Sequence, residues 1–518
     1  MKKSIEGRDI ILSAASGILI ALSFPKFGLF PLAWIGLAPL LIILKDKYKK
    51  EAFWFGWLAS LVFFLITINW VTITMHNYGK VPMPVSYAIM FLLALYLGLY
   101  TALFAYLYNM TKEGSPVIRL IIGPCIWAAL ELLRNYFITG FPWALLGYSQ
   151  YELLEIIQIA DITGVYGVSF LIVMSNIAIA EIAILIRKRG RKEKGHYKNL
   201  IALTAIPVFL FTAIYLYGYI KLTSNENDAN NQKIKVGLLQ GNIDQGVKWD
   251  VKFKRETIDI YLNLSKKAKA DGAELIIWPE TAAPFFFEEE KGYQKMLTDF
   301  ARENNVYLLF GSPAVKDNNK LLNRAYLISP KGEILSRYDK MHLVPFGEYV
   351  PLTKLLFFIN KMVEGIGDFT SGEEYSVMKT DGGRFGVVIC YEIIFPELVR
   401  EFVKKDANFM VTITNDAWFG KSSAPYQHFS MAVFRAIENR VPVVRAANTG
   451  ISGTIDSLGR IKKTTGIFVE TYITDEIEIS KEHKKTFYTR YGDIFSYICS
   501  ALVIGFFGWR LIKKRKKT

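Results

Sequence analysis

The sequence predicts two kinds of structure in one chain, a bundle of eight transmembrane helices and a layered α/β domain. Three observations support this prediction. Hydrophobic residues make up 52% of the 518 residues, more than a soluble chain can bury. Long apolar runs fill the first 222 residues and recur near the C-terminus. The region between them has a globular composition, in which short apolar runs alternate with helix-like segments.

Eight apolar segments are candidates for membrane spans. A helix needs about 20 apolar residues to cross a bilayer, and most of the segments have this length. The first two are shorter and are joined only by Pro-Lys-Phe-Gly. No small-x-small cleavage site follows the first segment, so we expect a retained helix and not a signal peptide. The segments are 9–24, 28–44, 52–74, 84–108, 117–134, 165–186, 200–221 and 494–512.

The net charge of +15 is concentrated in alternate connections between these segments. Lys and Arg cluster at the N-terminus and in 45–50, 187–198 and 513–517, whereas the loops 75–83 and 135–164 contain only Lys80. Basic residues favour the cytoplasmic side of a membrane, so both termini are expected in the cytoplasm and the α/β domain outside. Membrane anchoring explains the charge better than nucleic-acid binding, and we expect no nucleic-acid partner.

The chain divides at an Asn-rich linker, 223–233, which has the composition of a flexible connector. We expect a seven-span domain at 1–222, a catalytic domain at 223–490, and an eighth helix with a basic tail at 491–518. Strands are expected at 234–241, 274–280, 306–312, 324–329, 384–390, 408–416 and 442–450, and helices at 250–272, 291–304, 396–406 and 426–440.

Cys390 is the candidate nucleophile of the α/β domain. It ends an apolar strand-like run and is followed by Tyr391 and Glu392. Taken alone, a cysteine in this position is more often an inert buried residue, because free cysteine is among the most buried residue types. Tyr391 and Glu392 have an equally plain alternative, since residues after a strand often only pack or cap.

Two other segments favour a reactive thiol. Glu280 follows Trp-Pro at the end of another buried strand, where a carboxylate is costly unless it has a partner or a task. Lys340 and Glu348 lie in a loop that is rich in Pro, Gly and aromatic residues. Singly, these residues could be a helix cap or a solvated loop lysine. Together they supply a carboxylate to take the thiol proton and an ammonium to stabilise thiolate and oxyanion, so no histidine is required.

These residues resemble a known catalytic pattern. The carboxylate after Trp-Pro, the lysine in "YDKMHLVPFGEYVP" and the cysteine in "CYE" are similar to the Glu-Lys-Cys triad of the carbon-nitrogen hydrolase (nitrilase) superfamily. With the membrane spans, the chain resembles the apolipoprotein N-acyltransferase family over essentially its whole length. Four further segments carry this resemblance: "LLQGNIDQGVKWD", "HLVPFGEYVP", "NDAWFG" and "GFPWALLGYSQ".

The resemblance implies a nitrilase-like α-β-β-α sandwich in the periplasm, attached to an eight-helix bundle in a bacterial inner membrane. It implies Glu280 as general base, Lys340 as oxyanion stabiliser and Cys390 as nucleophile. Trp249, Glu348, Tyr391 and Glu392 match further positions that the family needs for activity. It implies no cofactor, and neither the three cysteines nor the five histidines have the spacing of a metal site.

The reaction implied is a two-step acyl transfer. Cys390 takes an acyl chain from a glycerophospholipid, and the thioester then acylates the free α-amine of a diacylglyceryl-cysteine at the N-terminus of an apolipoprotein. The apolar loop 135–151 could line the entrance for these lipids or form an interfacial aromatic belt. One alternative is a tethered amidase with water as acceptor, although one span would suffice as a tether. Another is a transporter or scaffold, which predicts more ionisable residues within the spans than Glu131, Arg134 and Glu181.

Overall fold

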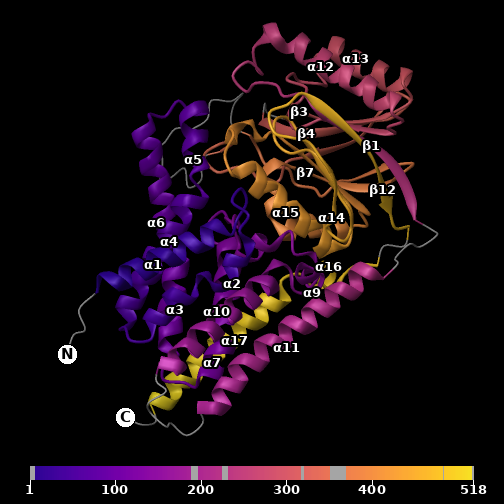
Figure 1. Cartoon of the computed structure of the whole chain (residues 1–518). Helices are drawn as coiled ribbons and strands as arrows, with labels where there is room; N and C mark the ends of the chain where they lie inside the picture. Colours follow the sequence, from indigo (N-terminus) through magenta and orange to yellow (C-terminus); the bar gives the residue numbers. More distant parts are fainter. Residues whose placement is uncertain are drawn as a thin grey trace. The chain divides into compact units, whose positions relative to one another are not determined.

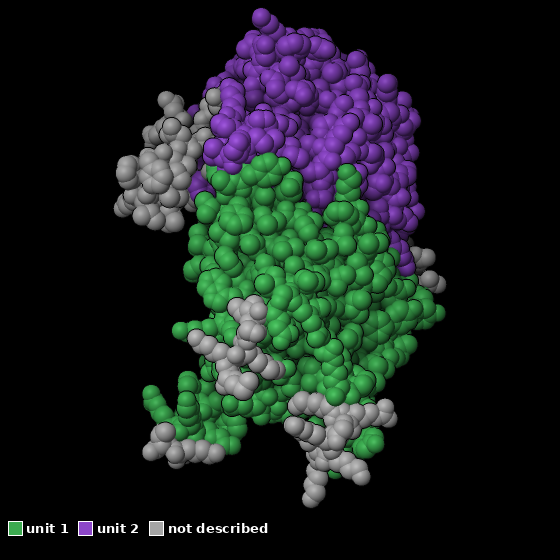
Figure 2. Space-filling model, turned by 60° about the vertical axis from the view of Figure 1, so that its left-hand side comes forward, with its two compact units in different colours: residues 1–69, 87–223, 491–518 green, residues 70–86, 224–490 purple. Residues whose placement is uncertain are grey.

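The computed structural model describes residues 6–187, 196–224, 231–316, 320–349, 369–481 and 484–515. Most of the basic loop 187–198, the middle of the linker 223–233 and the end of the tail 513–517 lie outside the described residues. The chain forms two compact units, which Figure 2 shows in different colours. One comprises residues 1–69, 87–223 and 491–518, and the other comprises residues 70–86 and 224–490.

The first unit is helical. Six helices are long and apolar enough to cross a membrane among the residues that the structure describes: α4 (Lys49–Thr67), α6 (Met83–Met110), α7 (Pro116–Tyr136), α10 (Val165–Arg187), α11 (His196–Thr223) and α17 (Ile494–Arg515). They correspond to six of the eight predicted segments. The first predicted segment is the shorter α1 (Gly7–Leu22). The second is divided into η1 (Phe30–Leu32), α2 (Ala33–Gly36) and α3 (Ala38–Leu44). The chain is therefore membrane-embedded, and the count of eight spans is consistent with it.

The loop after α7 folds into short helical turns. These are η3 (Leu146–Gln150), α8 (Leu154–Ile157) and α9 (Ala160–Thr163). Trp143 and Tyr148 of this loop are buried, at 0% and 1% exposure. A belt at a membrane surface would leave its rings exposed, so at least these two aromatic side chains serve packing within the helical unit.

The second unit contains two six-stranded mixed sheets. Their strand orders are β12-β1-β2-β3-β4-β5 and β11-β10-β9-β8-β7-β6. The first sheet comprises β1 (Gln232–Gln240), β2 (Leu275–Ile277), β3 (Tyr307–Lys316), β4 (Lys320–Ile328), β5 (Ile334–Asp339) and β12 (Thr471–Ile479). The second comprises β6 (Val377–Thr380), β7 (Gly383–Ile389), β8 (Phe409–Thr414), β9 (Val443–Ala447), β10 (Gly453–Ile455) and β11 (Ile461–Thr464).

Helices cover the outer faces of the two sheets, as Figure 1 shows. The helices α12 (Val251–Ala270) and α13 (Lys291–Glu303) lie over the first sheet, and α14 (Pro396–Lys404) and α15 (Ala424–Asn439) lie over the second. Strands β1 and β9 contact each other, so the sheets pack face to face. A last short helix, α16 (Phe487–Tyr491), precedes α17. This arrangement confirms the predicted α-β-β-α sandwich.

The sandwich follows from the apolar runs of the sequence. A core of aliphatic and aromatic residues fills the space between the first sheet and its two helices, including Ile258, Tyr261, Leu297, Leu308 and Phe310. Tyr261 and Trp278 stack with ring centroids 5.0 Å apart. Burial of such side chains contributes roughly 1.5–3 kcal/mol each, which stabilises the strand ends that carry Glu280 and Cys390.

Residues 70–86 belong to the second unit, although the sequence predicts 70–74 as the end of the span 52–74 and 84–86 as the start of the span 84–108. The helix α4 of the former span ends earlier, at Thr67. They include α5 (Trp70–Ile73) and the turn η2 (Thr74–Tyr78). The ring of Trp70 contacts Phe419 edge-on at 4.8 Å, and Tyr78 contacts Trp418 at 5.2 Å. Thr74 also donates a hydrogen bond to the carbonyl of Trp418 at 2.9 Å. This segment thus covers η6 (Asp416–Phe419), the turn that follows β8.

Candidate active site

Cys390 lies at the sharp turn between β7 and η5 (Cys390–Ile394). Its φ of 53° is in the left-handed region, which non-glycine residues seldom adopt. Strain of this kind costs of order 1–3 kcal/mol and persists only where the surroundings impose it. The turn brings the thiol out of the sheet while the residue stays 7% exposed. A strained, buried strand end is a favourable place for a nucleophile and a poor place for an inert residue.

Glu280 lies close to Cys390, at the end of β2, and is 6% exposed. Its Oε1 accepts hydrogen bonds from Asn323 Nδ2 at 2.8 Å and from Lys340 Nζ at 3.5 Å. Its Oε2 accepts one from the main-chain N–H of Asn415 at 3.0 Å. Gly311 permits the turn, because a Cβ there would lie 2.4 Å from the nitrogen of Thr281. Three separate elements therefore orient this carboxylate.

Lys340 directly follows β5 and is 1% exposed. Its Nζ donates to Glu348 Oε1 at 2.9 Å as well as to Glu280. Burial alone would lower the pKa of Lys340, but the charges of Glu348 and Glu280 outweigh it and raise that pKa above its usual value. Glu348 is held in turn by Asn323 Nδ2 at 3.2 Å and by the N–H of Val344 at 2.8 Å. Lys340 therefore remains an ammonium at any physiological pH.

The environment of the thiol favours the protonated form. Burial is the largest cause, and it raises the pKa of Cys390 above the ordinary cysteine value. The charge of Glu280 raises it further, whereas Lys340 lowers it by a smaller amount. The sequence suggests that a lysine depresses the thiol pKa, but here burial and the charge of Glu280 outweigh the effect of Lys340. A thiol in this form needs a base before it can act as a nucleophile, and Glu280 is a carboxylate whose charge acts on it.

Glu392 connects the turn at Cys390 to the loop that follows Lys340 through hydrogen bonds. It is fully buried, and its Oε1 accepts hydrogen bonds from Tyr338 Oη at 2.8 Å and from the N–H groups of Met341 and His342 at 2.7 and 3.0 Å. Its Oε2 accepts the N–H of Ile389 at 2.7 Å. Burial raises the pKa of Glu392 to about 7, against these hydrogen bonds, which lower it. A carboxylate two residues after Cys390 thus has four hydrogen-bond donors to satisfy.

The two aromatic candidates have different surroundings. Tyr391 is 7% exposed and lies against the rings of His342 and Phe395, at centroid distances of 5.9 and 5.2 Å. Burial raises the pKa of Tyr391 above its usual value, so the phenol stays neutral. Trp249 is partly buried, and the ammonium of Lys248 lies 5.9 Å from its ring centroid.

A buried network behind Cys390 joins His428 and Arg445, which the sequence does not single out, to Asp416, which ends a predicted strand. His428 Nε2 lies 3.1 Å from the carbonyl oxygen of Cys390, and because a carbonyl only accepts, Nε2 carries the proton. Its Nδ1 lies 3.1 Å from Asp416 Oδ1 and 2.9 Å from a guanidinium nitrogen of Arg445. Burial, reinforced by Arg445, lowers the pKa of His428, which favours the neutral ring. This network contacts the main chain of Cys390 at its strained turn.

Asn323 is a further contributor that sequence reasoning missed, and Asn415 is one whose contribution it did not foresee. Asn323 stands in β4 between Leu322 and Arg324, and a buried asparagine beside an apolar run could have been a signal. Asn415 was visible as a polar strand end, but its contribution is a main-chain N–H, which no sequence pattern encodes. Among the described residues, no group of three or more His, Cys, Asp or Glu side chains is arranged to hold a metal ion.

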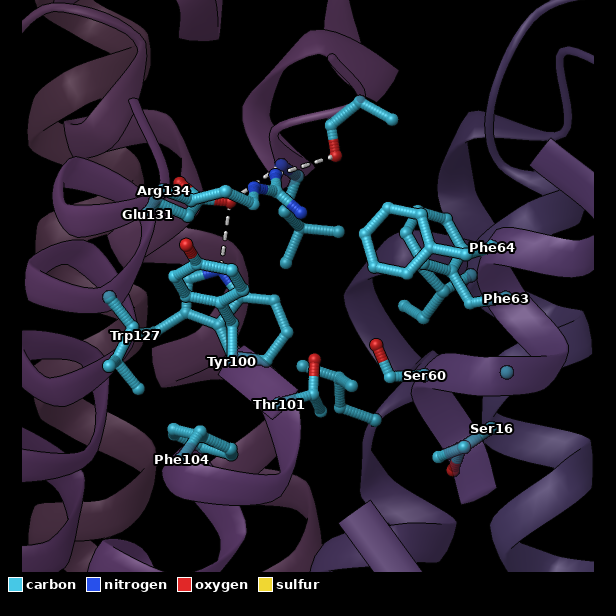
Figure 3. A pocket seen from close by; sticks show the side chains of 17 residues that line it. Ser16, Ser60, Phe63, Phe64, Tyr100, Thr101, Phe104, Trp127, Glu131 and Arg134 are labelled. Carbon is cyan, nitrogen blue, oxygen red and sulfur yellow. Dashed lines mark hydrogen bonds between the residues drawn. The ribbon is translucent and has the colours of Figure 1, made fainter. Parts of the chain in front are cut away.

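A cavity in the helical unit is lined by two of its buried charged residues, Glu131 and Arg134, as Figure 3 shows. Glu131 Oε1 accepts hydrogen bonds from Trp127 Nε1 at 2.9 Å and from the N–H of Leu146 at 2.8 Å. Arg134 donates to the carbonyl of Ala144 at 3.3 Å. Both charges thus hold the loop 140–150.

Glu181, the third ionisable residue of the predicted spans, pairs with Arg119 through two hydrogen bonds of 2.6 Å. Lys45 lies 3.7 Å from the same carboxylate. Like Glu131 and Arg134, Glu181 therefore has local partners. These partners are what a structural role requires, and they do not form the row of unpaired charges expected along a transport pathway.

Comparison with known proteins matches each of the two units to a known domain family. The carbon-nitrogen hydrolase family matches residues 235–483, and the apolipoprotein N-acyltransferase N-terminal domain matches residues 16–178. The first match and the site together identify residues 235–483 as a carbon-nitrogen hydrolase domain whose candidate active site contains Cys390. An amidase of the nitrilase superfamily from Nesterenkonia AN1 is 19% identical with a TM-score of 0.39 and covers 50% of this chain and 94% of its own, a likeness too remote to bear on function.

Two relatives identify the family. The apolipoprotein N-acyltransferase of Geobacter metallireducens is 47% identical over 502 residues, which covers 96% of this chain and 94% of the relative. That of Pasteurella multocida is 34% identical over 524 residues, covering 100% and 98%. The chain belongs to the apolipoprotein N-acyltransferase family, and it is a membrane-embedded acyltransferase.

Proposed function

We propose that this protein transfers an acyl chain from a glycerophospholipid to the N-terminal S-diacylglyceryl-cysteine of an apolipoprotein, with Cys390 as the covalent carrier. The observation that supports this most is the placement of a hydrogen-bonded carboxylate, Glu280, and a buried ammonium, Lys340, at one strained cysteine. Relatives named for the acceptor agree with it.

In the first half-reaction, Glu280 takes the thiol proton as Cys390 Sγ attacks an ester carbonyl of the phospholipid. The new C–S bond forms a tetrahedral intermediate, whose oxyanion faces the ammonium of Lys340. The ester C–O bond then breaks, and the proton on Glu280 passes to the departing alkoxide. The products are a lysophospholipid and an acyl thioester on Cys390.

In the second half-reaction, the α-amine of the apolipoprotein attacks the thioester carbonyl. Glu280 accepts a proton from the nitrogen, the C–S bond breaks, and the proton returns to the sulfur of Cys390. The product is an N-acylated, triacyl lipoprotein. The supporting residues Trp249, Glu348 and Tyr391 would shape the site or sustain the charge of Lys340, while Glu392 would hold the two catalytic segments together.

A direct test is mass spectrometry of the purified protein after incubation with phospholipid vesicles. The expected result is an acyl chain in thioester linkage on the peptide that contains Cys390, removed by hydroxylamine and by a diacylglyceryl-cysteine peptide. Chain release by water as fast as by the peptide amine would instead favour the tethered amidase. No acyl chain on Cys390 under any condition would refute the covalent mechanism.

We also propose that the catalytic domain, 223–490, is periplasmic and that both termini are cytoplasmic. The support is the alternation of basic and nearly charge-free connections along 1–222 and 491–518. An alkaline phosphatase fused after Asn230 should be active, since it folds only in an oxidising compartment, whereas the same reporter after Arg191 should be inactive. The reverse pattern would place the site in the cytoplasm and exclude an exported lipoprotein as acceptor.

A further inference from the structure

Lys248 is a second buried lysine of the catalytic unit. It lies in the loop between β1 and α12 and is 2% exposed, nearly as buried as Lys340. Within the described ranges no carboxylate lies at salt-bridge distance from its Nζ, whereas Lys340 has two. A buried ammonium without a paired carboxylate is costly, and proteins keep one only where its charge or its hydrogen bonds are needed.

The hydrogen bonds of Lys248 lead to the proposed base. Its Nζ donates to the carbonyl oxygen of Glu280 at 3.1 Å and to Oγ1 of Thr281 at 2.6 Å. Thr281 has a φ of 46°, so the main chain turns through the left-handed region directly after Glu280. Lys248 therefore bonds to both residues of a strained turn whose geometry determines where the Glu280 carboxylate points.

The two lysines act on Glu280 at different ends. Lys340 reaches its carboxylate, whereas Lys248 holds its main chain. The charges that act on Lys248 belong to the same site, because Glu280 and Cys390 both raise the pKa of Lys248. Burial outweighs them and lowers the pKa of Lys248 to about 8. Of the two ammonium groups, only Lys248 loses its charge as the pH rises through about 8.

We propose that Lys248 is a positioning residue of the acyl-transfer reaction, which fixes Glu280 through its main chain and adds positive charge beside Cys390. The inference rests on the roles proposed above for Glu280 and Cys390. When Lys248 is charged, it should stabilise the thiolate that forms during attack and strengthen the bond to the Glu280 carbonyl. When it deprotonates, both contributions weaken, so acylation should slow as the pH rises through about 8.

The test measures the rate at which a phospholipid vesicle acylates Cys390, between about pH 6 and about pH 9. Lys248→Met should lower the rate at neutral pH by roughly tenfold to a hundredfold, since it removes both the charge and the hydrogen bonds. It should also abolish the decline above pH 8. Lys248→Arg should restore part of the rate and show no alkaline decline, because a guanidinium stays protonated throughout this range. The matched control is Lys252→Met, an exposed lysine of α12, which should keep the wild-type rate and pH profile.

Each other outcome has a definite meaning. A folded Lys248→Met protein with the wild-type rate and pH profile would overturn the inference and leave the covalent mechanism intact. If this variant does not fold, the wild-type profile decides, because a rate that does not fall through pH 8 excludes a contribution from the Lys248 charge. A lower rate with an unchanged alkaline decline would reduce Lys248 to a purely structural residue. If the wild-type protein forms no thioester at all, the proposed function itself fails.

Discussion

Two buried glutamates, one in each unit, show how similar residues acquire different tasks. Glu280 is 6% exposed and Glu131 is 5% exposed, and each lies near a buried cation. The two oxygens of Glu280 accept hydrogen bonds from three elements and face a thiol, Cys390. Glu131 uses one oxygen to hold Trp127 and the N–H of Leu146. Burial and charge are therefore common to both carboxylates, and what distinguishes Glu280 is the thiol on which its charge acts.

The largest loss of activity is expected when the thiol of Cys390, which distinguishes the surroundings of Glu280 from those of Glu131, is removed. Cys390→Ser should abolish both the thioester and transfer, because a hydroxyl is far harder to ionise than a thiol whose pKa burial already raises. The protein should remain folded, since the change is nearly isosteric. Transfer to a diacylglyceryl peptide is the measurement. The control is Cys499→Ser, a buried thiol of the helical unit, and near-normal transfer by Cys390→Ser would end the nucleophile assignment.

The next effect distinguishes the partners of the thiol. Glu280→Gln removes the proton acceptor, and Lys340→Met removes the charge that faces the oxyanion. Each should lower the rate of thioester formation by on the order of a hundredfold or more. Lys254→Met is a suitable control, because Lys254 is a partly buried lysine of the same domain that pairs with Glu290 and has no contact with the site. If either catalytic variant kept a tenth or more of the wild-type rate, another group would have to perform its role.

A smaller effect is expected at Glu392, which supports the site from behind. Glu392→Gln puts an amide where four donors converge, so at least one buried N–H or hydroxyl loses its acceptor, at a cost of about 1–3 kcal/mol.

The pKa of Glu392 also gives the sign of a pH effect. Because this pKa is raised to about 7 in the folded protein, its contribution to stability is present below the unfolded value and is lost as the pH rises through 7. Thermal unfolding of the purified protein should show this loss in the wild type but not in Glu392→Gln. An equal pH dependence in both proteins would contradict the assignment.

The smallest effect on the reaction is expected at Glu131, and the same substitution at Glu131 and at Glu280 compares the two glutamates directly. Glu131→Gln keeps an oxygen for Trp127 and Leu146 but leaves Arg134 without its neighbouring negative charge, so the protein should be less stable. Transfer per folded molecule should change less than twofold to threefold, in contrast to the same substitution at Glu280. A loss of thioester formation as large as that of Glu280→Gln, in a folded protein, would show that the helical unit takes a direct part in the chemistry.

Much of the fold followed from local patterns. All seven predicted strands and all four predicted helices of the α/β domain are present, because each is a continuous apolar run or an amphipathic segment. The strands that were not anticipated lack that pattern. All four residues of β11 are exposed, and in β5 exposed and partly buried residues alternate, with Tyr338 as its single buried residue. Such strands form because a neighbouring strand offers its free hydrogen-bonding edge, which a sequence read alone does not reveal.

The site, like the fold, has features that the sequence predicts and features that only the tertiary structure shows. The sequence by itself determined the membrane-embedded class and the layered α/β domain, because spans and buried runs are properties of short segments. Its family motifs implied the sandwich and predicted the site residues, which are Trp249, Glu280, Lys340, Glu348, Cys390, Tyr391 and Glu392. Only the tertiary structure decided how these residues act on one another. It placed a second carboxylate on Lys340, raised the pKa of Cys390, and assembled the His428 network and the contact of Lys248 with Glu280. The physical reason is that pKa values, strain and hydrogen bonds depend on distances between segments far apart in the chain, and folding sets those distances.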